Sequence, residues 1–155
     1  MPYAAAHDNV QLYFEEAGSG TPIIFLHEFA ADHSNWEPQM RYFSRGHRCI
    51  AYSARGYAPS DVPPSAEAYT FRHFYTDALA VLDHLKIAQA HFVGLSMGSY
   101  SSLQVALNAP ERALSMTLAG VGAPGRAWKI GSLSGRSAGP RPINMRRSAR
   151  PRSPR

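Results

Sequence analysis

The apolar positions of the first 122 residues follow two alternating periods, one typical of strands and one typical of helices. Val10–Glu15 alternates apolar and polar residues, which predicts a half-buried strand. Pro22–Leu26 is a short continuous apolar run, and Arg48–Tyr52 is a second candidate of this kind. Such runs are typical of parallel strands covered on both faces. In Thr70–Leu85 the apolar residues recur at helical spacing behind a threonine suited to an N-cap, so this segment predicts a helix.

The alternation continues through the rest of this part of the chain. Further helices are expected over Asn35–Ser44 and Met97–Asn108, and further strands over Ala90–Leu95 and Leu114–Ala119. Strands that alternate with helices form a mostly parallel sheet with helices on both faces. We therefore expect an α/β fold.

After Gly122 the periodicity stops. Residues 124–155 are rich in Arg, Pro, Ser and Gly, and they hold nine cationic and no acidic residues, whereas residues 1–123 hold seven cationic and all eleven acidic residues. The net charge of +5 thus combines an acidic body with a basic tail. We expect two parts, a folded domain over 1–122 and a disordered tail over 123–155.

The tail suggests a function of its own. Its cations would bind RNA, DNA or an acidic membrane through counterion release. It contains one aromatic residue, Trp128, and no base-reading motif, so no specific nucleic acid is expected as a partner. A non-enzymatic anion-binding or nucleic-acid-binding protein stays open as an alternative. A shifted reading frame in a GC-rich gene would also produce this composition.

Composition excludes several classes of protein. With Cys49 as the one cysteine of 155 residues, neither an intramolecular disulfide nor a Cys-rich metal site can form. No apolar run approaches the ~20 residues of a transmembrane helix. Met1–Asp8 has neither a basic start nor an apolar core, so a secretory signal is not expected. We expect a cytoplasmic protein without a metal site or a membrane partner.

The candidate chemistry lies around Ser96. Gly94–Gly98 reads G-x-S-x-G between the expected strand Ala90–Leu95 and the helix that follows it. This is the context of a nucleophile elbow, in which the serine hydroxyl is exposed at the tip of a tight turn. The backbone N–H of Met97 then lies at a helix N-terminus, which favours developing negative charge.

A second candidate segment, His27-Glu28-Phe29, follows the buried strand Pro22–Leu26. A loop at this place can supply a second backbone N–H to an oxyanion. Without the elbow, the segment would indicate only an ordinary loop with a structural histidine.

Taken together, these motifs resemble the N-terminal half of the α/β-hydrolase fold family, over about residues 8–122. The likeness is nearest to 3-oxoadipate enol-lactonases and cofactor-free haloperoxidase-like esterases. The segments that carry it are Val10–Gly20, Ile24–His27, Trp36, Ser53–Asp61, the elbow and Ala109–Arg112.

The resemblance implies a serine hydrolase that acts on a small ester, lactone or related carbonyl substrate without a cofactor. It implies that Ser96 is the nucleophile, that the backbone N–H groups of Met97 and Phe29 form the oxyanion hole, and that His27 is structural. Glu28 stands where the family usually has Gly, which would oppose negative charge if the carboxylate pointed inward. A Ser rather than an Asp at position 96 argues against an epoxide hydrolase.

The family's other catalytic residues are not where the resemblance places them. They follow the nucleophile in the order acid, then His. Beyond Ser96 this sequence has no His, and Glu111 is its only acid. His33 is the least implausible upstream substitute. We therefore expect a chain truncated or frameshifted after about residue 122, inactive alone, and prone to self-association through an exposed edge at Leu114–Ala119.

Overall fold

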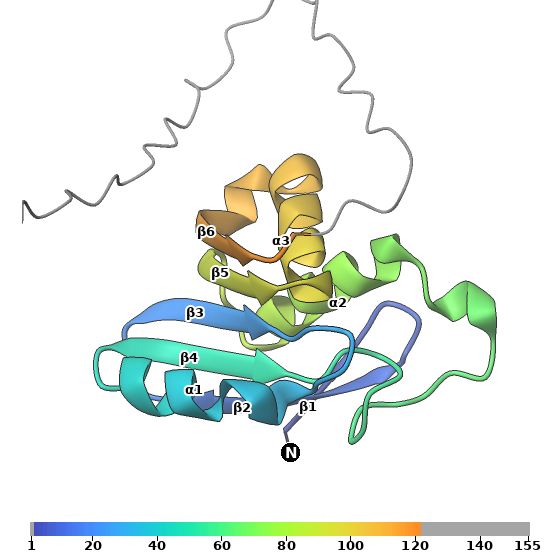
Figure 1. Ribbon diagram of the computed structural model, residues 1–155, viewed down its shortest axis with the longest axis horizontal. Coiled ribbons are helices and arrows are strands. Elements are labelled where there is room, and N and C mark those ends of the chain that lie inside the picture. Colours follow the sequence, from blue (N-terminus) through green and yellow to red (C-terminus); the bar gives the residue numbers. More distant parts are fainter. Residues whose placement is uncertain (1, 122–155) are drawn as a thin grey trace, which may run out of the picture. The chain divides into compact units, whose positions relative to one another are not determined.

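The apolar runs expected as buried strands form the centre of a six-stranded sheet in the computed structural model, which describes residues 2–121 (Figure 1). The expected tail at 123–155 lies outside the described residues. The strands are β1 (Tyr3–Ala5), β2 (Gln11–Ala17), β3 (Thr21–Leu26), β4 (His47–Tyr52), β5 (Ala90–Leu95) and β6 (Ala113–Ala119). The α-helices are α1 (Glu37–Phe43), α2 (Phe71–His84) and α3 (Met97–Asn108). Short 3₁₀ turns occur at η1 (His33–Trp36), η2 (Ala66–Ala68) and η3 (Pro110–Arg112).

The sheet is mixed but mostly parallel, as the sequence predicts. Its strand order is β1-β2-β4-β3-β5-β6. β3 is parallel to both β4 and β5, and β5 is parallel to β6, whereas β2 is antiparallel to β4 and to β1. The sequence did not indicate β1, because three residues are too few to show a period. The carboxyl ends of β3, β4 and β5 meet at one edge (Figure 1).

Two separate apolar clusters show that both faces of the central strands are covered. Ile24 and Leu26 of β3 belong to one cluster, together with buried residues of α2 and α3. Ile23 and Phe25 belong to the other, together with Trp36 and with Met40 of α1. Because side chains alternate across a strand, a continuous apolar run can serve both clusters. The expected α/β architecture is confirmed.

The expected helices differ from the observed ones mainly at their ends. The helix expected at Asn35–Ser44 begins earlier, as the turn η1, because the Asp32 carboxylate accepts a hydrogen bond from the Ser34 N–H (2.8 Å). Thr70 caps α2 as expected, since its hydroxyl oxygen accepts from the His73 N–H (3.3 Å). No helix among residues 2–121 is long and apolar enough to cross a membrane.

Arg55 holds the loop after β4 in place. Its buried guanidinium donates to both carboxylate oxygens of Asp77 on α2 (2.7 Å each) and to Asp8 in the β1–β2 turn (2.7 and 3.1 Å). It also donates to the Ala68 carbonyl of η2 (3.0 Å). One side chain therefore ties three segments that lie far apart in the sequence to the edge of the sheet where β4 ends.

Candidate functional site

Ser96 lies at the tip of the turn between β5 and α3, where the sequence predicts the elbow. Its backbone angles are φ 50° and ψ −110°, and its side chain is half-buried. Residues other than glycine rarely adopt a positive φ, and such strain persists only where the surrounding structure imposes it. The backbone at Ser96 is therefore strained, and the packing of the surrounding fold offsets the free energy of that strain.

The two glycines of the motif are required by close packing. A Cβ on Gly94 would lie 2.5 Å from the backbone of Gly98, and a Cβ on Gly98 would overlap the carbonyl of Leu26 at the end of β3. Neither position therefore has room for a side-chain atom. Glycine at these positions lets α3 start directly against β3 and β5.

Hydrogen bonds to the end of β6 hold the elbow. The Ser96 N–H donates to the Ala119 carbonyl (2.8 Å). The buried Ser99 hydroxyl lies within hydrogen-bond distance of the carbonyls of Gly94 (2.6 Å) and Ala119 (2.8 Å). These contacts fix the direction of the turn relative to the sheet. Ser99 was not singled out from the sequence.

His27 is buried at the start of the loop that follows β3, and both of its ring nitrogens have partners. The Ala54 N–H donates to Nε2 (3.0 Å), so Nδ1 carries the proton and donates to the Glu28 carbonyl (2.7 Å). Burial lowers the pKa of His27 below its usual value. These contacts occupy the ring in holding two loops together, as expected of a structural histidine.

Side chains from two loops and from the start of α3 meet beside the elbow. The Tyr57 ring packs edge-to-face against His27 and Phe29, with centroid distances of 4.7 and 6.3 Å. The Tyr57 hydroxyl lies 3.9 Å from Sδ of Met97. The structure thus brings Phe29 and Met97 into contact with one tyrosine. The sequence analysis did not identify Tyr57, whose only signal was its place within the segment Ser53–Asp61.

His33 is bound elsewhere in the structure. Its Nδ1 lies 2.8 Å from the Ser53 hydroxyl and its Nε2 lies 3.4 Å from a carboxylate oxygen of Glu15 on β2. Its ring packs edge-to-face on Tyr13 of the same strand. β3 and β4 lie between β2 and β5 in the sheet, so these contacts hold His33 away from Ser96.

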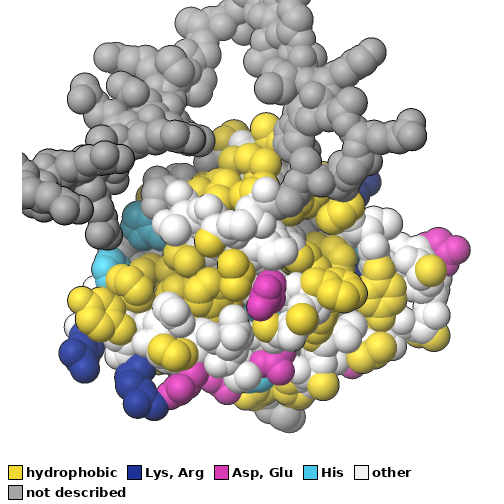
Figure 2. Space-filling model, viewed as in Figure 1, with side chains coloured by type: hydrophobic (Ala, Val, Ile, Leu, Met, Phe, Trp, Pro, Cys, Tyr) yellow, Lys and Arg dark blue, Asp and Glu magenta, His cyan; other side chains and the backbone are white. Residues whose placement is uncertain are grey.

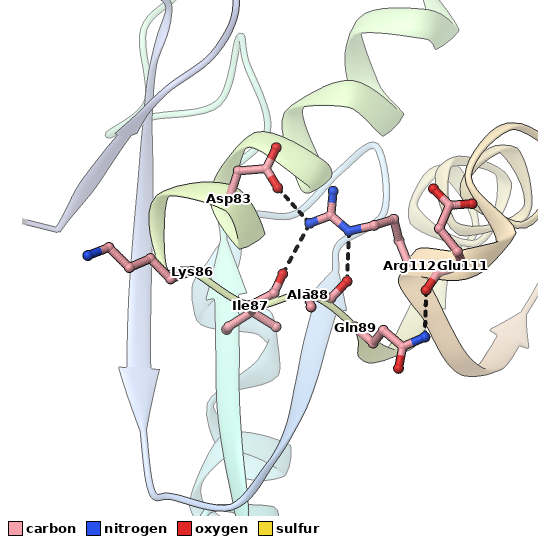
Figure 3. Close-up of a pocket in the computed structure, with 7 residues that line it drawn as sticks. All are labelled: Asp83, Lys86, Ile87, Ala88, Gln89, Glu111 and Arg112. Carbon is pink, nitrogen blue, oxygen red and sulfur yellow. Dashed lines mark hydrogen bonds and ion pairs between the residues drawn. The ribbon is translucent and has the colours of Figure 1, made fainter.

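Glu111 lies at the opposite end of β5 from Ser96. It belongs to a hollow lined by Asp83, Lys86, Ile87, Ala88, Gln89, Glu111 and Arg112 (Figure 3). The Gln89 amide donates to its carbonyl (2.7 Å). Since a strand rises ~3.3 Å per residue, the six-residue β5 separates the two places by ~17 Å. Glu111 is thus too far away to act on the serine.

Arg112 explains why the Ala109–Arg112 segment matters to the fold. Its guanidinium donates to the Asp83 carboxylate (2.6 Å) and to the carbonyls of Ile87 (3.1 Å) and Ala88 (2.8 Å), as Figure 3 shows. It thereby holds the turn between α2 and β5.

No group of three or more His, Cys, Asp or Glu side chains within residues 2–121 is arranged to hold a metal ion.

Known proteins similar to this chain share the fold that its geometry indicates. The pattern of the alpha/beta hydrolase fold family matches residues 21–134. Among curated proteins, the chain is 34% identical over 108 residues to Epoxide hydrolase 1 of Siraitia grosvenorii, covering 69% of this chain and 34% of that protein. It is 35% identical over 97 residues to 3-oxoadipate enol-lactonase 1 of Acinetobacter baylyi, covering 63% and 35%. It is 32% identical over 99 residues to the non-heme haloperoxidase of Rhodococcus erythropolis, covering 63% and 35%.

A solved structure shows the same likeness. The enol-lactonase from Burkholderia xenovorans superposes with a TM-score of 0.70 at 31% identity, covering 76% of this chain and 45% of its own. The chain belongs to the alpha/beta hydrolase fold family. The expected likeness to enol-lactonases and haloperoxidases is confirmed. The chain spans about a third of the length of these curated relatives.

Proposed function

We propose that this fold serves serine-type hydrolysis, with Ser96 as the nucleophile toward an ester, a lactone or a related carbonyl substrate. The observation that carries this proposal is the positive φ of Ser96 at the tip of the strand–turn–helix junction. A strained turn of this kind exposes the hydroxyl above the edge of the sheet, where a substrate carbonyl can approach it.

The oxyanion hole of this proposal consists of the backbone N–H groups of Met97 and Phe29. Met97 is the first residue of α3, so its N–H carries the partial positive charge of a helix N-terminus. Phe29 lies in the loop after β3, the strand that pairs with β5 through Leu26 and Gly94. Two fixed donors of this kind stabilise the negative charge that develops on a carbonyl oxygen during attack.

The substrate class follows from position 96 and from the relatives. Both an enol-lactonase and epoxide hydrolases are among them. An epoxide hydrolase of this family would carry Asp at the nucleophile position, whereas this chain has Ser. A serine hydroxyl suits acyl transfer from an ester or lactone. We infer a small-molecule carbonyl substrate and no cofactor.

A chain of these 155 residues lacks a base for Ser96. Beyond Ser96 the sequence contains no His, and its one acid there, Glu111, lies at the far end of β5. His27 and His33 are engaged in other contacts. An oxyanion hole without a base leaves ~10³–10⁴-fold catalysis over water, so this chain alone would turn a substrate over slowly or not at all, while an activated phosphonate would still react slowly with Ser96.

Labelling of Ser96 by a fluorophosphonate tests the proposal. We expect slow phosphonylation that maps to Ser96 by mass spectrometry and disappears in Ser96→Ala. Ser115→Ala, which removes an exposed serine of β6, serves as the matched control and should label at the wild-type rate. An adduct elsewhere, or none at all, would overturn the role of Ser96, and rapid labelling would contradict the absence of a base.

The alternative function uses the basic residues of 124–155, which number nine with no acid among them. It predicts a salt-sensitive mobility shift with RNA or DNA that is lost when 124–155 is deleted.

Three further expectations stay predictions from the sequence. They include the two-part organisation into 1–122 and 123–155 and a cytoplasmic location. Self-association through β6 is a further part of the proposal.

A further inference from the structure

Tyr57 contacts the side chains of both residues whose backbone N–H groups form the proposed oxyanion hole. Its ring packs against the ring of Phe29 at 6.3 Å with an interplanar angle of 86° and against the buried His27 at 4.7 Å. Its hydroxyl reaches Sδ of Met97 at 3.9 Å. Among residues 2–121, no other side chain makes aromatic or hydrogen-bond contacts with both Phe29 and Met97.

The backbone around Tyr57 holds it firmly. The Tyr57 N–H donates to the Ala54 carbonyl (3.1 Å), and the Ser60 N–H donates to the Tyr57 carbonyl (3.0 Å). Gly56 before it has φ 86°, and a Cβ there would lie 2.7 Å from the Tyr69 ring, so this conformation requires glycine. Tyr57 thus projects from a rigid turn next to the buried Arg55.

The loop that carries Phe29 has few other restraints. The Phe29 side chain is 75% exposed. Within the described part of the chain, no hydrogen bond joins residues 28–31 to residues 96–98. Beyond the β3–β5 pairing and the backbone packing of Gly98 against the carbonyls of Leu26 and His27, the described side-chain contacts between this loop and Met97 run through Tyr57.

Resting on the proposed function, we infer that Tyr57 is a positioning residue that sets the separation between the N–H groups of Phe29 and Met97. An oxyanion hole works only when both donors lie 2.7–3.1 Å from the same oxygen. A shift of ~1 Å in one donor is enough to lower the rate a hundredfold. A side chain that contacts both donor residues from a rigid turn limits such shifts.

Three variants of the full chain test this inference, each followed by the rate of Ser96 phosphonylation and by the amide resonances of Phe29 and Met97. Tyr57→Ala should slow labelling by about tenfold or more and move both resonances, because the link between the loops is lost. Tyr57→Phe keeps the ring contacts with His27 and Phe29 and loses the hydroxyl contact with Met97, so it should move the Met97 resonance, leave that of Phe29 in place and slow labelling less than Tyr57→Ala.

Ile87→Ala is the control for stability. Ile87 is buried in the turn between α2 and β5, at the end of β5 remote from Ser96, so its truncation destabilises the fold without touching the loops. Its labelling rate, corrected for the unfolded fraction from thermal melts, should equal that of the wild type. If the unfolded fraction of Tyr57→Ala accounts for its whole loss of labelling, the positioning role would be overturned.

The inference and the proposed function can fail separately. If the wild type resists labelling at Ser96, the proposed function fails, while the two amide resonances still decide the role of Tyr57. Resonances of Phe29 and Met97 that stay unmoved in Tyr57→Ala would overturn the positioning role even if labelling of that variant is slowed. Movement of both in Tyr57→Ala, and of neither in Ile87→Ala, would support it.

Discussion

At the scale of single residues, the elbow depends on positions where no side chain fits. Gly98, in the first turn of α3, packs against the carbonyls of Leu26 and His27. Gly94 packs against the backbone of Gly98. A carbonyl oxygen of a paired strand cannot move away without breaking the sheet. The motif is therefore a packing requirement of this junction as well as a chemical one.

Gly98→Ala should destabilise the protein by about 1–3 kcal/mol or more, because its methyl group overlaps the Leu26 carbonyl. Gly46→Ala is the matched control, since a Cβ there meets no atom within 4 Å and its φ is not positive. It should be neutral or stabilise by about 0.4–1 kcal/mol through the unfolded chain. Urea unfolding of both variants measures the difference, and equal midpoints would contradict the close packing.

His27 makes stability depend on pH in a defined window. Burial lowers its folded pKa below the value of about 6.5 expected in the unfolded chain, so the unfolded state binds the proton more readily. The contribution of His27 is therefore complete above pH 6.5 and is lost as the pH falls toward the folded pKa. Thermal melts between pH 7.5 and 5 should show this loss in the wild type.

His27→Gln should be less stable at pH 7.5 and should show a flatter profile over the same window, because glutamine keeps an acceptor for the Ala54 N–H and does not titrate. His84→Gln is the comparison, since that side chain is exposed at the end of α2. A His27→Gln profile as steep as that of the wild type would assign the pH dependence to other groups.

At the scale of elements, buried charge adds polar contacts between segments that one apolar cluster also joins. Arg55 and Asp77 are each 1% exposed and form two hydrogen bonds with each other. Arg55 also binds Asp8, and its guanidinium holds the pKa of that carboxyl below its usual value. The loop after β4 is therefore attached to α2 and to the β1–β2 turn, and it carries Tyr57 two residues further on.

Asp77→Ala should cost about 3–5 kcal/mol, because it leaves the Arg55 guanidinium buried without its main partner. Arg41→Ala removes an exposed pair with Glu37 one helical turn away and should cost about 0.5 kcal/mol at most. Denaturant unfolding of the two variants checks the contrast. Similar small losses in both would show that the buried pair adds little.

At the scale of the whole molecule, the described sheet ends in an apolar strand. β6 pairs with β5, and no other strand of residues 2–121 pairs with it. Leu114 and Leu118 of β6 are 44% and 36% exposed. Hydrophobic side chains also cover a broad part of the face seen in Figure 2. Exposed apolar edges of this kind favour association with another chain.

Sedimentation velocity of the full chain should therefore show dimers or larger species that depend on concentration. Leu114→Lys with Leu118→Lys should shift the distribution toward monomer, since charges on an edge strand oppose pairing. Leu107→Lys on α3 is the matched control, because that leucine is also exposed at 58% but does not belong to the edge. A wild type that sediments as a monomer at all concentrations would contradict the prediction.

Much of the local structure could be predicted from the sequence, because the signals are short in range. The apolar runs predicted β3, β4 and β5 within one residue, Thr70 was correctly expected as the cap of α2, and G-x-S-x-G located the turn at Ser96. Each of these depends on residues that are neighbours in the chain, so a pattern of period two or 3.6 is enough to indicate them. β1 was missed because it is too short for any period.

Only the tertiary structure decided which distant residues meet. Because β4 lies between β2 and β3, the loop after β4 comes beside the loop after β3, and Tyr57 thereby reaches Phe29 and Met97. The same order commits His33 to Ser53 and Glu15, and it gives Arg55 its two carboxylates. Contacts of this kind depend on strand order and on the direction of each side chain. No local pattern of residues encodes either, so the sequence located the proposed nucleophile and the fold located its neighbours.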